Sequence, residues 1–210
     1  EFGTDALRFT FASMATTGRD VRFDLKRIEG YRNFCNKLWN AARFIIMNTE
    51  GVKLPAKKPN PEDMSLADIW IQGKLHSLIK SVEKNISNYR IDLIANSLYD
   101  FVWHDYCNWY LELSKPILKD DDQSKLEQKQ ATQINLLYTL DATLKCLHPI
   151  IPFITEELFQ KIDPGQKKSS IMVQNYPNAK DFMVNQLVLD QMDWLITFVV
   201  SVRQIRSEMN

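Results

Sequence analysis

DLKRIEGYRNFCNKLWNAARFIIMNTE, residues 24–50, has the pattern of one long amphipathic helix. Asp24 suits its N-terminus, because the carboxylate can accept a hydrogen bond from the amides of the first turn. Glu50-Gly51 suits its end. Apolar residues recur with a 3,4,3,4,3 spacing that gives one buried stripe: Ile28, Tyr31, Cys35, Leu38, Ala42 and Ile45.

The other side of this helix is polar, with one exception. It carries Glu29, Asn33, Asn36, Lys37, Asn40 and Arg43. Phe44 lies eleven residues after Asn33, nearly three full turns, and therefore falls on the polar side. An aromatic ring among amides and cations is typical of a surface on which nucleic-acid bases stack. On pattern alone, packing of Phe44 under a neighbouring helix is the favoured alternative.

Other segments of the chain predict further helices. The predicted ranges are 4–17, capped by Thr4; 65–88, with a capping box formed by Ser65 and Asp68; 92–116; 124–147; 152–162; and 187–209. Residues 171–173 read as a brief extended stretch. About seven helices and almost no strand predict an all-α antiparallel helical bundle.

Four motifs in order resemble a known family. GTDALRF (3–9), EGYRNFCNKLWNAARF (29–44), WYLELSKP (109–116) and HPIIPFITEEL (148–158) are similar to the helical anticodon-binding domain of valyl-tRNA synthetases. These are class I enzymes of the valine, isoleucine and leucine group. The resemblance covers essentially the whole chain, which reads as a piece of a larger protein. It implies three parts: a connecting helix (1–18), the anticodon-binding bundle (19–162), and a segment (163–210) whose loop, extended stretch and C-terminal helix complete that bundle.

The resemblance also implies what the chain binds and does. Its partners would be valine tRNA and the catalytic domain of the same polypeptide, and it would be a monomer. The parent enzyme uses ATP and Mg to ligate valine to tRNA through HIGH and KMSKS signatures. Neither signature occurs here, so we expect this chain to need no cofactor and to catalyse nothing by itself.

Four positions match the family's anticodon contacts. They are Lys26, Phe44, Leu111 and Glu112; Arg19, Arg22, Lys37 and Arg43 are weaker candidates for the tRNA backbone. Eighteen residues separate Lys26 from Phe44, which is about 27 Å along a helix, so the two side chains cannot hold the same base. Asn108 stands where the family usually has Asp.

The distribution of charge, the cysteines and the length of the apolar runs indicate what the chain can bind and where it can work. The formal net charge is zero, but residues 1–60 hold 11 Lys/Arg against 6 Asp/Glu, a net of +5, and residues 61–122 hold 6 against 11, a net of −5. A basic first third can meet phosphate although the total is neutral. The widely spaced Cys35, Cys107 and Cys146 indicate neither a disulfide framework nor a metal site, and fit a reducing, cytoplasmic location. No apolar run is long enough to span a membrane.

Two other functions stay open at this point. One is the equivalent domain of an isoleucyl- or leucyl-type synthetase, since sibling domains share the architecture. The other is a helical protein-interaction module, which the acidic middle third favours. Catalysis by His104 and Cys107, three residues apart, lacks an orienting group and an oxyanion site in the sequence.

Overall fold

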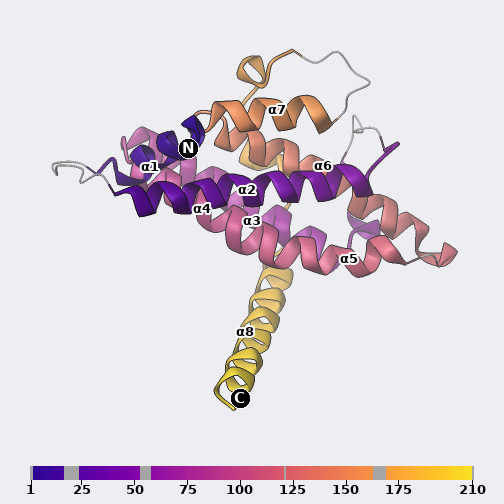
Figure 1. Ribbon diagram of the computed structural model, residues 1–210. Coiled ribbons are helices and arrows are strands. Elements are labelled where there is room, and N and C mark those ends of the chain that lie inside the picture. Colours follow the sequence, from indigo (N-terminus) through magenta and orange to yellow (C-terminus); the bar gives the residue numbers. More distant parts are fainter. Residues whose placement is uncertain (1, 17–23, 53–57, 121, 163–168, 210) are drawn as a thin grey trace.

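The computed structural model describes residues 2–16, 24–52, 58–120, 122–162 and 169–209 (Figure 1). No strand occurs in these ranges, which confirms the all-α prediction. The main elements are α1 (Thr4–Met14), α2 (Leu25–Asn48), α3 (Leu66–Ser87), α4 (Ile91–Asp100), the π-helix η2 (Phe101–Tyr110), α5 (Leu111–Lys119), α6 (Leu126–Leu147), α7 (Pro152–Ile162) and α8 (Gln186–Glu208). Because α4, η2 and α5 run on without a break, the described helices form seven rods.

Side-chain caps set the starts of α2, α3 and α8. The Asp24 carboxylate accepts a hydrogen bond from the Lys26 amide, as predicted. Ser65 and Asp68 form the predicted capping box at the start of α3. At α1 the prediction was wrong: Gly3, at φ 84°, precedes the first turn, and Thr4 already lies inside the helix.

Three further boundaries differ from the prediction. Helix α1 ends at Met14, before the predicted end at 17. Helix α5 continues through Pro116 to Lys119, since the burial of Leu118 (7% exposed) holds the turn that proline weakens. Residues Ile171–Val173 form one 3₁₀ turn and not an extended stretch, because the Ser170 hydroxyl caps the Met172 amide.

Helix α2 crosses the bundle with a neighbour on each flank (Figure 1). It packs against α7 on one side and against η2 on the other, while α1 and α6 cover its apolar stripe. Leu38 and Ile45 of the predicted stripe are fully buried, whereas Tyr31 and Cys35 are only half-buried; Phe34, which the pattern did not include, is fully buried beside them. The polar side of α2 is therefore a strip bounded by α7 and by the continuous rod of η2 and α5.

Helix α8 points away from the other helices (Figure 1). Only Val188 and Met192 of this helix are buried, and both lie in its first half. Gly73 of α3 lets α8 approach, since a Cβ there would lie 3.0 Å from a Leu189 methyl carbon. The boundaries proposed from sequence at residues 18/19 and 162/163 stay predictions.

One buried carboxylate joins three helices in the core. Asp68 of α3 is 0% exposed and accepts hydrogen bonds from the Tyr110 hydroxyl (2.7 Å), the Thr132 hydroxyl (2.7 Å) and the Asn135 amide (3.2 Å). It also accepts the Ser65 hydroxyl at 2.6 Å. Buried polar groups are stabilising only when their partners are in place. This cluster therefore fixes α3, α6 and the end of η2 relative to one another.

Replacing this carboxylate should destabilise the fold strongly. Asp68→Ala leaves the buried hydroxyls of Tyr110 and Thr132 without their acceptor, and each such loss costs ~1–3 kcal/mol. We expect the free energy of unfolding, measured by urea denaturation with circular dichroism, to fall by ~3 kcal/mol or more. Asp190→Ala on exposed α8 is the control and should change it by ~0.5 kcal/mol at most. A loss below ~1 kcal/mol for Asp68→Ala would contradict this role.

Candidate nucleic-acid interface

Helix α2 concentrates positive charge. Its 24 residues include Lys26, Arg27, Arg32, Lys37 and Arg43 but a single carboxylate, Glu29. Glu29 pairs with Arg32 at 3.2 Å, three residues away. Lys26, Arg27, Lys37 and Arg43 are exposed or half-exposed, so that α2 presents a local positive field although the whole chain is neutral.

Lys37 is held in place by groups from η2. Its Nζ lies 3.9 Å from the centroid of the Trp103 ring and donates a 2.7 Å hydrogen bond to Oδ1 of Asn108. A cation over an aromatic face is attracted by the ring's quadrupole. Lys37 thus stands in a defined position at the border between α2 and η2, with part of its surface exposed.

The Trp103 ring is itself supported from the core. It stacks on Tyr99 at 5.5 Å with an interplanar angle of 9°, and Tyr99 stacks on Phe34 at 5.1 Å. Phe34 in turn contacts Phe9 of α1 at 4.9 Å. This line of rings runs from a fully buried phenylalanine to the surface cation, and it holds the position of Lys37.

Phe44 lies on the same border as Lys37. Its ring is half-buried and packs against the core, so it neither projects freely nor is sealed. The Lys115 Nζ from α5 lies 5.7 Å from the ring centroid and pairs with Glu112 at 2.6 Å. A positive charge therefore lies near the ring, with a carboxylate paired to it.

These residues form one surface, which we call the α2–α5 face: Lys37, Phe44, Asn108, Glu112 and Lys115. Lys37 and Phe44 lie seven residues apart, two turns, or about 10 Å along α2. The face combines a ring, two ammonium groups, an amide and a carboxylate. Such a set can stack on an unpaired base, hydrogen-bond its edge and meet a phosphate.

Two other residues predicted from the sequence to contact the anticodon, Leu111 and Lys26, are not part of the α2–α5 face. Leu111 is buried (6% exposed) and lies beneath Glu112, directly after Tyr110 with its bond to Asp68. Lys26 is exposed in the first turn of α2, eleven residues from Lys37 and so ~16 Å away along the helix.

Arg43 is exposed one residue before Phe44, on the flank of α2 that faces α7. Arg19 and Arg22 lie outside the described residues.

The sequence reasoning overlooked Lys115 and gave Lys37 a minor part. Lys115 is seventy-one residues from Phe44 and Asn108 is seventy-one from Lys37, so no local pattern predicts either pairing. One local signal existed. Pairs of buried residues recur along this rod at Phe101-Val102, Tyr106-Cys107 and Tyr110-Leu111. The step from the first pair to the second is five residues, which is the hydrogen-bonding interval of a π-helix. This π-helix turns Asn108 toward α2.

The three cysteines are buried or half-buried, and His76 and His148 form hydrogen bonds within the fold. Burial raises the pKa of the Cys107 thiol to about 12, so it is not an activated nucleophile beside His104. Burial likewise raises the pKa of Cys35 and Cys146 to about 12. Nδ1 of His76 bonds the Ala179 carbonyl oxygen at 2.8 Å.

Within the described ranges, His, Cys, Asp and Glu side chains form no group of three suited to a metal ion, and no helix has the length and apolarity to cross a membrane.

Comparison with known proteins identifies relatives along the whole chain. Valine–tRNA ligases of Legionella pneumophila (strain Paris), Coxiella burnetii and Acinetobacter baylyi are 49%, 46% and 44% identical to it, over 100%, 99% and 99% of its length. The chain spans only 23%, 22% and 21% of those proteins.

A solved structure shares the fold. It is the ternary complex of Agrobacterium radiobacter K84 agnB2 LeuRS with tRNA and LeuAMS, with a TM-score of 0.63 and 16% identity, matching 90% of this chain and 20% of that one. The family described as the anticodon-binding domain of tRNA ligase matches residues 68–210. The chain therefore belongs to the family of anticodon-binding domains of tRNA ligases.

Proposed function

We propose that this chain binds the anticodon loop of valine tRNA through the α2–α5 face. The observation that supports this best is that Lys37 and Phe44, two turns apart on α2, meet Asn108, Glu112 and Lys115 from the η2–α5 rod. A stacking ring, paired charges and an amide thus share one surface in a family that binds anticodons.

The chemistry of this face suits an unpaired loop. Loop bases can leave the stack and present both a flat face and a hydrogen-bonding edge. The exposed part of the Phe44 ring offers the stacking partner, and the Glu112 carboxylate can accept from a base amino group. Lys115 and Lys37 supply donors for base oxygens or phosphate.

Valine as the cognate amino acid rests on the relatives. The proteins that are 44–49% identical to the chain are valine–tRNA ligases, whereas identity to the leucine enzyme is 16%. We infer that the whole polypeptide ligates valine to tRNA. This chain would act as its recognition part and as a monomer, and the ligation chemistry would lie in the remainder.

The direct test is a titration with isolated anticodon stem-loops. The chain should bind a valine-tRNA stem-loop more tightly than the same stem-loop altered at the middle anticodon base, as measured by fluorescence anisotropy. Equal affinity for both, with the fold intact by circular dichroism, would remove the proposed selectivity.

Phe44→Ala should weaken binding of the valine stem-loop by about ten-fold to a hundred-fold, because a base–aromatic stack is worth ~1–3 kcal/mol. Phe153→Ala on α7, where the ring is 64% exposed, is the matched control and should leave the dissociation constant unchanged. An unchanged constant for Phe44→Ala in a folded variant would exclude Phe44 as the stacking residue.

Salt dependence separates RNA binding from protein binding. Log affinity should fall steeply and linearly with log salt, and Lys26→Gln should reduce that slope by about one if Lys26 meets a phosphate. Its loss of affinity should be similar for stem-loops of different sequence, since phosphate carries no sequence information. A flat salt response of the unaltered chain would favour a helical protein-interaction module.

A further inference from the structure

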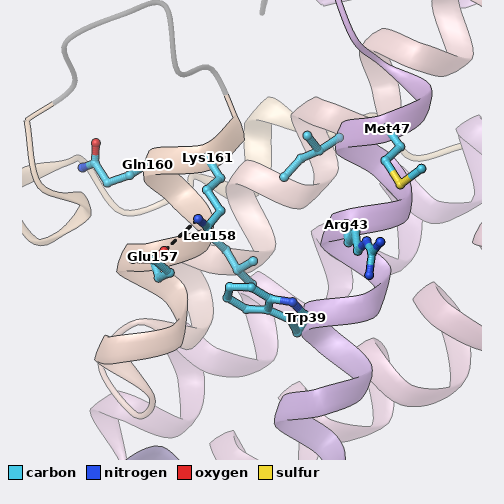
Figure 2. A pocket seen from close by; sticks show the side chains of 8 residues that line it. Trp39, Arg43, Met47, Glu157, Leu158, Gln160 and Lys161 are labelled. Carbon is cyan, nitrogen blue, oxygen red and sulfur yellow. Dashed lines mark ion pairs between the residues drawn. The ribbon is translucent and has the colours of Figure 1, made fainter.

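A hollow lies on the flank of α2 opposite the α2–α5 face, against α7. It measures about 600 Å³ and is lined from α2 by Trp39, Arg43 and Met47 and from α7 by Glu157, Leu158 and Lys161. Figure 2 shows the Trp39 indole reaching from α2 toward α7, with Arg43 and Met47 at successive turns along the same helix. We call this hollow the α2–α7 groove.

The groove combines an open aromatic face with cations. Trp39 is 37% exposed, and the Lys161 Nζ lies 5.9 Å from its ring centroid. Lys161 also pairs with Glu157 at 2.8 Å (Figure 2), which offsets its charge. Arg43 is exposed and, within the described ranges, has no ion-pair partner. The rest of the lining is Gln160 and three apolar residues: Ile46, Met47, which is 66% exposed, and Leu158, which is buried.

The groove is continuous with the α2–α5 face across the surface of α2. At 100° per residue, Phe44 lies on the edge toward α5 and Trp39 on the edge toward α7, with Asn40 and Arg43 between them. Both intervening side chains are exposed. A helix with its side chains is ~10–12 Å across, so one short single-stranded segment can touch both edges.

Charge favours nucleic acid as the occupant. Helix α2 carries five Lys/Arg against one carboxylate, and the Arg43 cation lies at the mouth of the groove. An indole beside a guanidinium provides a stacking face for a base together with a donor fork for its phosphate. A purely apolar protein helix would leave Arg43 without an anionic partner.

We propose that the α2–α7 groove holds an unpaired nucleotide of the same RNA loop, with its base against Trp39 and its phosphate against Arg43. This inference rests on the proposed function and extends it, since α2 would then contact the loop along both flanks. Unlike Phe44, Trp39 lies on the edge of α2 away from α5, so the two rings serve different nucleotides.

The test uses valine stem-loops that each carry 2-aminopurine at one unpaired position. At one position at least, binding should quench the emission, because a stacked base fluoresces less than a free one. Trp39→Leu should restore that emission and weaken binding roughly five-fold or more, whereas Trp39→Phe, which retains a ring, should keep most of the quenching. Trp194→Leu on α8, with a ring 68% exposed, is the matched control and should change neither quantity.

Arg43→Gln gives an independent measurement, because Arg43 is exposed and its loss should not disturb folding. It should weaken binding and lower the salt slope by about one. If Phe44→Ala impairs binding but Trp39→Leu and Arg43→Gln do not, the groove has another occupant, such as a protein surface, and this inference is wrong while the proposed function stands. If none of the three variants affects binding, both proposals fail.

Discussion

The buried Asp68 carboxylate is the constraint on which the remaining geometry depends. It takes part in the capping box that begins α3 and accepts hydrogen bonds from α6 and from the last residue of η2. Tyr110, the donor from η2, is fully buried, and burial raises the pKa of its hydroxyl well above the usual value, so it stays a donor. The next two residues are Leu111 and Glu112. Core hydrogen bonding therefore determines where α5 presents its carboxylate to the α2–α5 face.

The α2 half of the face is fixed by a different interaction. Lys37 would lose side-chain entropy if it had to be ordered by a ligand. Here the Trp103 ring and the Asn108 amide already restrain it, and stacked aromatic rings connect Trp103 to the core. Such preorganisation lowers the entropic cost of binding. The two halves of the face are thus held by different interactions: buried hydrogen bonds to Asp68 position the α5 half, and stacked aromatic rings position the α2 half.

Local chemistry made much of the fold predictable. The caps at Asp24 and Ser65 involve residues within a turn of each other, and both predictions were confirmed. The 3,4 spacing of α2 identified Ile28, Leu38, Ala42 and Ile45 as buried, but Tyr31 and Cys35 are only half-buried, and Phe34 and Ala41 are buried instead. The site was harder to predict, because Lys37 contacts Asn108, which is seventy-one residues away in the sequence. In addition, the residues of the ten-residue π-helix η2 do not follow the 3.6-residue repeat of an α-helix, so that repeat does not give the direction of their side chains. A periodicity of 3.6 therefore places Phe44 on the polar side of α2 but cannot say which side chains of η2 and α5 face it.

The distribution of charge explains how a chain of zero formal net charge can present a surface suited to an anion. Several carboxylates of the acidic segment 61–122 are buried or paired with a cation. Asp68 is buried, Asp92 is 4% exposed and pairs with Arg90 at 2.6 Å, and Glu112 pairs with Lys115. Burial raises the pKa of Asp105 to about 6, which brings its titration close to neutral pH. The fields of the opposite charges in such pairs largely cancel at distances well beyond their 2.6 Å separation, and salt screens the remainder beyond a Debye length of ~8 Å. Lys26, Lys37 and Arg43 lie on the polar side of α2 and, within the described ranges, have no carboxylate partner. Their fields therefore add where the proposed RNA would approach, and the formal total says little about that surface.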